Sequence, residues 1–141
     1  MLRYLLDTNI ASYILKRSSA AVLRRLESAA VNEIAISVIT KAELLYGVEI
    51  APVPERYNAA VQEFLRFMQV LDFPDAAALE YARIRASLKR TGQLIGGNDL
   101  LLAAHARALG LTLVTNNTRE FCRVSGLVLE DWTQDFKEPA S

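Results

Sequence analysis

The chain has 141 residues, of which 52% are hydrophobic and 23% are charged. This length and composition are typical of one ordered globular domain and argue against a disordered or fibrous chain. The 16 basic and 16 acidic residues cancel, so a nucleic-acid site must be a local patch rather than a general basic field. A single cysteine, Cys122, excludes an internal disulfide and favours a reducing compartment, so we expect a cytoplasmic protein.

No stretch reaches the roughly 20 apolar residues that a membrane-spanning helix needs, and the apolar run before Asp7 is too short for a signal-peptide core. We therefore expect one domain over residues 1–136, no membrane partner, and a disordered tail over residues 137–141.

Short apolar runs alternate along the chain with longer segments in which apolar residues return every three or four positions. This alternation predicts an α/β fold with a short, mostly parallel sheet covered by helices. The expected strands are residues 3–6, 34–37, 69–72, 112–115 and, more weakly, 127–130. The expected helices are residues 20–27, 41–48, 55–68, 75–90 and 99–109, and another helix is expected after the first strand.

Several polar residues lie just beyond the predicted strands. In an open parallel sheet, ligands bind at the carboxyl ends of the strands. Asp7 follows the first strand, Glu43 lies six residues beyond the second in the first turn of its helix, and Asp99 opens the last long helix. The polar segment 115–118 follows the strand at 112–115. We expect these residues to lie on one edge of the sheet.

Each of these residues also has a purely structural interpretation, because Asp, Asn, Thr and Glu commonly begin helices. The segment 40–43 (TKAE) fits a capping box, Asn98 can cap the helix of Asp99, and Asp7 or Thr8 can cap the first helix. A lone histidine on a mostly apolar helix, His105, is more often packed than catalytic.

The three acids together favour a metal site over three separate caps. Asp7, Glu43 and Asp99 would repel one another at one edge unless a cation lay among them. Carboxylate oxygens suit Mg²⁺, for which Mn²⁺ can substitute, whereas zinc would recruit histidine or cysteine.

Four segments, in order, carry a family resemblance: residues 5–9 (LLDTN), 42–47 (AELLYG), 95–106 (IGGNDLLLAAHA) and 113–121 (LVTNNTREF). They resemble the signature blocks of PIN-domain ribonucleases and, more narrowly, of the VapC toxins of bacterial toxin–antitoxin pairs. The similarity spans nearly the whole chain and implies the three-layer α/β/α fold of PIN domains.

The resemblance implies that Asp7, Glu43 and Asp99 occupy the family's three acidic metal-binding positions. The fourth position departs from the pattern, because many PIN domains carry aspartate where this chain has Asn117; Glu120 could restore the missing charge. Hydrogen-bonding support for these ligands is expected from Thr8, Asn9, Thr115 and Asn116.

The activity implied is that of a Mg²⁺-dependent endoribonuclease toxin that cuts RNA, with a tRNA anticodon stem-loop as the leading substrate, and thereby inhibits translation. A VapB-like antitoxin, a homodimer and a larger toxin–antitoxin assembly are the implied protein partners. The apolar residues of the region 11–26 could form a partner surface, although core packing is favoured for most of them.

Basic residues occur in two places where RNA could bind. One group lies on a single predicted helix and the other beside the last block, and each is either a solvated face or an RNA-contacting surface. The residues are Arg83, Arg85, Lys89, Arg90, Arg119 and Arg123.

Two other functions remain open at this point. A PIN-like domain weakened by Asn117 could serve as a non-catalytic RNA-binding module, although three mutually repelling carboxylates argue for a metal. A structure-specific DNA nuclease would use the same metal chemistry.

Overall fold

The computed structural model describes residues 1–134, so the expected tail at 137–141 lies outside the described residues. Its centre is a parallel sheet with the strand order β3-β2-β1-β4-β5. The strands are β1 (Tyr4–Leu6), β2 (Ile34–Ser37), β3 (Gln69–Leu71), β4 (Thr112–Val114) and β5 (Leu129–Glu130). The predicted strand positions are thus confirmed, with up to two residues trimmed from an end.

The middle of the sheet is apolar on both faces, as expected for parallel strands covered by helices. Leu5 of β1 lies between Ala35 of β2 and Leu113 of β4, and all three are fully buried. The helices that cover the sheet are α1 (Thr8–Lys16), α2 (Ala20–Ser28), α3 (Val38–Ile50), α4 (Pro54–Phe67), α5 (Ala76–Arg90), α6 (Gly97–Leu109) and α7 (Thr118–Phe121), with a short 3₁₀ turn η1 (Val31–Glu33).

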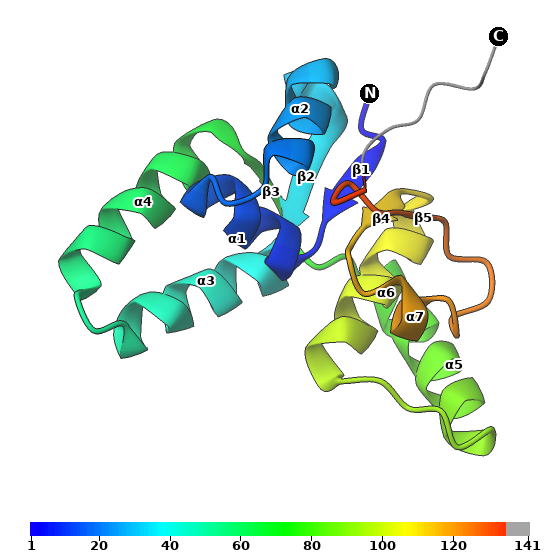
Figure 1. Ribbon diagram of the computed structural model, residues 1–141. Coiled ribbons are helices and arrows are strands. Elements are labelled where there is room, and N and C mark those ends of the chain that lie inside the picture. The colour runs from blue at the N-terminus through cyan, green and yellow to red at the C-terminus, as the bar shows by residue number, and fades with distance from the viewer. Residues whose placement is uncertain (135–141) are drawn as a thin grey trace, which may run out of the picture.

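Side chains of β1 alternate between two cores, because successive residues of a strand point to opposite faces. Leu5 packs into a core with α5 and α6, whereas Tyr4 and Leu6 pack into a second core with residues of α1 to α4. Figure 1 shows these two helical groups on either side of the strands. The molecule is therefore an α/β/α three-layer structure, as the family resemblance implies.

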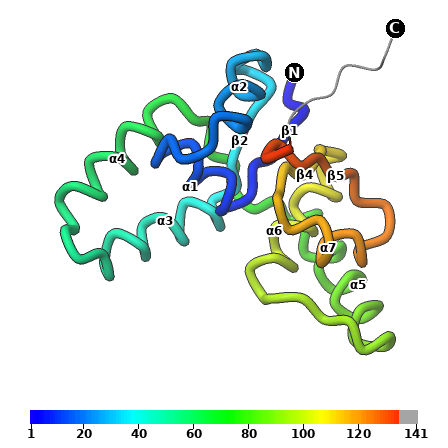
Figure 2. The backbone as a smooth tube through the Cα atoms, in the orientation of Figure 1, coloured from blue at the N-terminus to red at the C-terminus, as the bar shows by residue number. Residues whose placement is uncertain are grey.

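The helices α3 and α4 run out from the sheet and back, and form an arm that projects from the rest of the chain (Figure 2). The arm starts directly at the carboxyl end of β2, since Ser37 ends the strand and Val38 begins the helix. Within residues 1–134, no helix combines the length and the apolar character that crossing a bilayer would require.

Two predicted helix starts were wrong. The Ser37 hydroxyl accepts a hydrogen bond from the Ile39 N–H at 3.0 Å, so α3 begins three residues before the expected start at residue 41. The expected capping box at 40–43 therefore lies inside the helix, and Glu43 sits in its second turn rather than its first. At α6 the N-cap is Gly96, whose carbonyl accepts from the Leu100 N–H at 2.9 Å, and the expected cap Asn98 is a helical residue.

The apolar residues of the region 11–26 lie mostly in the interior. Ala11 is fully buried, and Tyr13, Ile14 and Leu15 are half-buried against the second core. Core packing is therefore confirmed for these residues.

Candidate metal centre

Asp7 is the most enclosed acid at the carboxyl edge of the sheet. It follows β1 directly, is only 4% exposed, and caps α1 by accepting a hydrogen bond from the Ile10 N–H at 2.9 Å. Burial raises the pKa of Asp7 to about 6; a hydrogen bond from Thr115 and the one from Ile10 oppose this rise, and the charges of Asp99 and Glu43 add to it. A carboxylate in this position is costly to ionise without a cation nearby.

Glu43 reaches the same edge from α3 and is held there by α1. The Thr8 Oγ1 lies 2.9 Å from the Glu43 Oε1 and 3.2 Å from the Thr40 Oγ1. A hydroxyl has one proton, and a carboxylate is the stronger acceptor, so Thr8 donates to Glu43 and accepts from Thr40. Thr8 thus orients Glu43, the supporting role that the sequence predicted for it.

Asp99 approaches from the first turn of α6. Its pKa is raised by burial and by the negative charges of Glu120 and Glu43. The Asn117 Nδ2 donates a hydrogen bond of 3.0 Å to the Glu120 Oε2, which holds that carboxylate in the first turn of α7. The structure therefore brings Asn117 and Glu120 together: the amide orients the carboxylate, and the carboxylate supplies the negative charge felt by Asp99.

The loop after β4 is braced on both sides. The hydroxyl of Thr115, fully buried, accepts from the Asn117 N–H at 2.9 Å. Asn116 accepts from the Asn9 Nδ2 at 3.4 Å and donates to the Tyr13 hydroxyl at 3.0 Å, which ties the loop to α1. Of the three residues predicted to support the ligands, only Thr115 contacts one of the acids, through its hydrogen bond to Asp7, whereas Asn9 and Asn116 contact each other and Tyr13.

The donor set fits a hard divalent cation. The negative charges of Asp99 and Glu43 raise the pKa of Asp7, and those of Glu120 and Glu43 raise the pKa of Asp99. Within residues 1–134, no basic side chain lowers either pKa. Among residues 1–134, no three His, Cys, Asp or Glu side chains are arranged so that together they could hold a metal ion. Mg²⁺ usually takes one or two carboxylates directly and completes its shell with water, so the other acids of this cluster would hold the ion through water ligands.

His105 joins the two helices that carry Glu43 and Asp99. Its ring is fully buried, its Nδ1 lies 2.9 Å from the Ser37 Oγ, and it packs edge-on with Phe73 at 5.5 Å between ring centroids. Burial lowers the pKa of His105, so the ring is neutral at pH 7. The sequence-based interpretation of His105 as a packed residue is confirmed.

An open pocket of about 440 Å³ lies beside these acids, lined by Thr8, Ile39, Ala42, Glu43, Tyr46 and Asn98. This volume is in the range of small-molecule sites. Tyr46 is 65% exposed, one turn of α3 away from the carboxylate. Tyr46 is not among the residues predicted from the sequence, although an exposed aromatic residue in the AELLYG block was a signal that could have identified it.

The predicted basic residues are all exposed, on α5 and in or just after α7. Arg85 is exposed and donates to the Tyr81 hydroxyl at 2.8 Å, and Lys89 and Arg119 are exposed as well. Arg83 and Arg123, in contrast, line one small pocket together with Arg107.

Residues 4–127 match the PIN domain family. The chain belongs to the PIN-domain family, within its VapC group. It is 46% identical over 132 residues to Ribonuclease VapC2 of Haemophilus influenzae, across 94% of this chain and 99% of that protein. It is 44% identical over 133 residues to the tRNA(fMet)-specific endonuclease VapC of Shigella flexneri, across 94% of this chain and all of that one.

Solved PIN-domain structures agree with the fold. The crystal structure of VapBC2 from Rickettsia felis bound to a DNA fragment from their promoter superposes with a TM-score of 0.87 at 40% identity, over 93% of this chain and 99% of that one. The match therefore covers nearly all of the strands and helices that place the acids at one edge of the sheet.

Proposed function

We propose that the protein is a Mg²⁺-dependent endoribonuclease and the toxin of a VapBC-type pair, acting in the cytoplasm, with Mn²⁺ able to replace Mg²⁺. The observation that carries this proposal is the gathering of Asp7, Glu43, Asp99 and Glu120 at the carboxyl edge of the sheet, with raised pKa values at Asp7 and Asp99 and no basic partner in the described chain. The names of the full-length relatives, which are ribonucleases and endonucleases, support the same activity.

The acids and the hydroxyl groups beside them have different roles in the proposed site. Asp7, Glu43 and Asp99 would hold the ion, and Glu120, oriented by Asn117, would bind through water or enter the shell by a side-chain rotation. When bound, a divalent ion would lower the pKa of a water ligand and stabilise the negative charge that develops on the phosphate during cleavage. Thr8 and Thr115 keep two of the carboxylates in place by hydrogen bonds.

RNA is the substrate that this site and its relatives favour. The adjoining pocket offers an exposed tyrosine ring, Tyr46, beside the carboxylate Glu43, and unstacked bases of single-stranded RNA commonly stack on such rings. Because one 44%-identical relative is called tRNA(fMet)-specific, we propose a tRNA anticodon stem-loop as the target, whose cleavage would inhibit translation.

Two protein partners belong to the proposal. Several structural neighbours are VapBC complexes, which supports a VapB-like antitoxin as the natural inhibitor of this chain. A homodimer, and its assembly with the antitoxin into a larger complex, complete the proposed organisation.

The test is cleavage of total RNA and of purified tRNAs by antitoxin-free protein in Mg²⁺, with fragment ends mapped by sequencing. We expect a few defined cuts in tRNA that disappear with EDTA and with Asp99→Asn, and that persist with Asp75→Asn, an exposed acid at the start of α5. Cutting of DNA instead of RNA would replace the proposal by a DNA nuclease. RNA binding without metal-dependent cutting would replace it by a binding module.

A further inference from the structure

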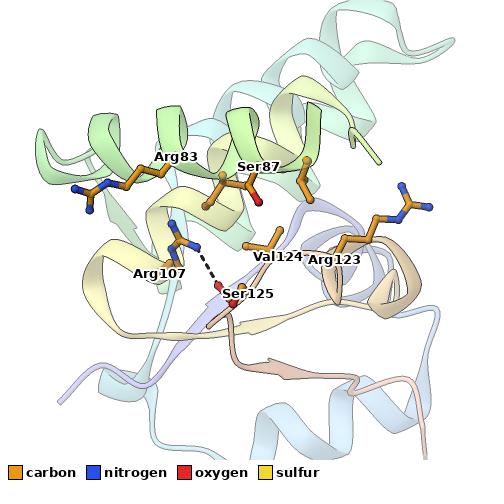
Figure 3. A pocket seen from close by; sticks show the side chains of 8 residues that line it. Arg83, Ser87, Arg107, Arg123, Val124 and Ser125 are labelled. Carbon is orange, nitrogen blue, oxygen red and sulfur yellow. Dashed lines mark hydrogen bonds between the residues drawn. The ribbon is translucent and has the colours of Figure 1, made fainter. Parts of the chain in front are cut away.

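A small arginine-lined notch lies on the α5–α6 side of the molecule, and none of the four acids lines it. Its floor is apolar and buried, formed by Ile84, Leu88 and Val124. Its rim carries Arg83 and Ser87 of α5, Arg107 of α6, and Arg123 and Ser125 of the chain after α7. Figure 3 shows Arg83 and Arg123 at opposite ends of the notch, with Arg107 between them.

The volume of the notch limits what it can hold. It measures about 40 Å³, which is room for a few water-sized groups and far below the roughly 150 Å³ that holds a benzene ring. A nucleobase or a cofactor ring therefore does not fit inside. The oxygens of a phosphate group do fit, with the rest of the group at the open mouth.

The charge of the notch favours an anion. Arg107 pairs with Glu80 and donates to the Ser125 carbonyl at 2.9 Å, so it braces the loop and has its charge partly balanced. Within residues 1–134, Arg123 donates two long side-chain bonds of 3.4 Å, to the carbonyls of Gln93 and Leu94, and a guanidinium has five N–H groups. Arg83 and Arg123 contribute exposed positive charge in a chain whose net charge is zero.

The notch is coupled to the acid cluster through a single turn of backbone. The Arg123 N–H donates to the Glu120 carbonyl at 3.1 Å, and Glu120 is the carboxylate felt by Asp99. Arg123 also contacts the 93–94 segment that leads to α6. The Arg123 end of the notch therefore lies beside the backbone that carries Glu120, and a strand that passes the acids would reach this end of the notch first.

We propose that Arg83, Arg107 and Arg123 form a subsite for backbone phosphates of the RNA strand, next to the linkage that is cut. The row of guanidinium groups along the notch suits several phosphates of one strand better than a single free anion. This inference rests on the proposed ribonuclease function. It revises the sequence-based choice of basic residues by retaining Arg83 and Arg123, adding Arg107, and leaving the other four outside the subsite, namely Arg85, Lys89, Arg90 and Arg119.

The test is the salt dependence of RNA binding, measured by fluorescence anisotropy with the non-cutting Asp99→Asn protein and an RNA that the native protein cuts. Each lost phosphate contact lowers the slope of log affinity against log salt by about 0.7 to 0.9. We expect this loss for Arg83→Gln and for Arg123→Gln. The matched control is Arg66→Gln, an exposed arginine of α4 on the other side of the sheet, which should retain the parent slope.

A second readout locates the contact. When single phosphates of the RNA are replaced in turn by neutral methylphosphonates, one position near the cut should weaken binding by the parent protein but not by Arg123→Gln. Parent slopes in both notch variants, with cleavage by the native protein intact, would overturn the subsite and leave the ribonuclease standing. A parent that neither binds nor cuts RNA would overturn both, and loss of antitoxin affinity alone would assign the notch to a protein.

Discussion

At the scale of one residue, the raised pKa of Asp7 makes the stability of the fold depend on pH. Its pKa is about 6 in the folded chain and 3.8 for an aspartate in an unstructured peptide, which represents the unfolded chain. The folded state thus holds this proton more tightly, so stability from this group is complete below pH 3.8 and is lost as the pH rises through 6. The difference corresponds to about 3 kcal/mol by pH 7.

Asp7→Asn is therefore expected to flatten the dependence of unfolding free energy on pH. The amide oxygen can still cap α1, while the buried charge is removed. Denaturant titrations in EDTA at pH 4.5 and 7.5 should show native stability falling with pH by about 2 kcal/mol more than that of the variant, because about 1 kcal/mol is already lost at pH 4.5. Parallel curves for the two proteins would show that Asp7 does not titrate in this way.

Tyr46 offers a test of the pocket beside the acids. Stacking of one base on an aromatic ring contributes about 1–3 kcal/mol, so Tyr46→Ala should weaken RNA binding at least about fivefold. Tyr46→Phe retains the ring and should bind within about twofold of the native protein in the same assay. Equal affinities for the alanine and phenylalanine variants would remove Tyr46 from the RNA site.

At the scale of elements, the helices α3 and α6 are joined by one buried contact. The Ser37 hydroxyl contacts both the Ile39 N–H and the His105 ring, so Ser37→Ala leaves one partly buried and one buried polar group without this partner. Each such group costs about 1–3 kcal/mol. We expect a loss of at least about 2 kcal/mol of unfolding free energy and slower RNA cleavage, because Glu43 and Asp99 lie on these two helices.

The matched control for that variant is Ser28→Ala, which removes an exposed hydroxyl from the last turn of α2. It should change unfolding free energy by less than about 0.5 kcal/mol and leave cleavage unchanged. Similar behaviour of the two variants would mean that the Ser37–His105 contact does not align the site.

The sequence predicted the strands and most helices well because their apolar periods are unambiguous. It failed at the start of α3, where Ser37, Thr40 and Glu43 all have the chemistry of helix starts, and only the tertiary contact to His105 favours Ser37. The carboxylates at the strand ends were predictable from their positions in the chain. The pairing of Asn117 with Glu120 was not, because it depends on a single turn of α7.

At the scale of the whole molecule, the projecting arm exposes apolar surface. Ile50 and Val53, at the junction of α3 and α4, are 64% and 52% exposed. We expect this junction to be covered in the proposed homodimer, since contiguous exposed apolar groups commonly mark protein interfaces. Light scattering should give twice the monomer mass for the native chain and the monomer mass for Ile50→Glu.

The control is Val31→Glu, which places the same charge on an apolar side chain that is 78% exposed in the η1 turn. It should remain dimeric. A native monomer, or an Ile50→Glu dimer, would contradict the placement of the interface. Neither the arginine notch nor this junction could be predicted from the sequence, because each combines side chains that only the folded chain brings together.

The central claim is that the acids at the carboxyl edge of the sheet hold a divalent cation. Calorimetric titration of the apo protein with Mn²⁺ tests it directly, with Asp99→Asn as the site variant and Asp75→Asn as the control. We expect saturable binding by the native and Asp75→Asn proteins, and at least about tenfold weaker binding by Asp99→Asn. Equal binding by all three proteins, or no binding by the native protein at millimolar Mn²⁺, would contradict this claim.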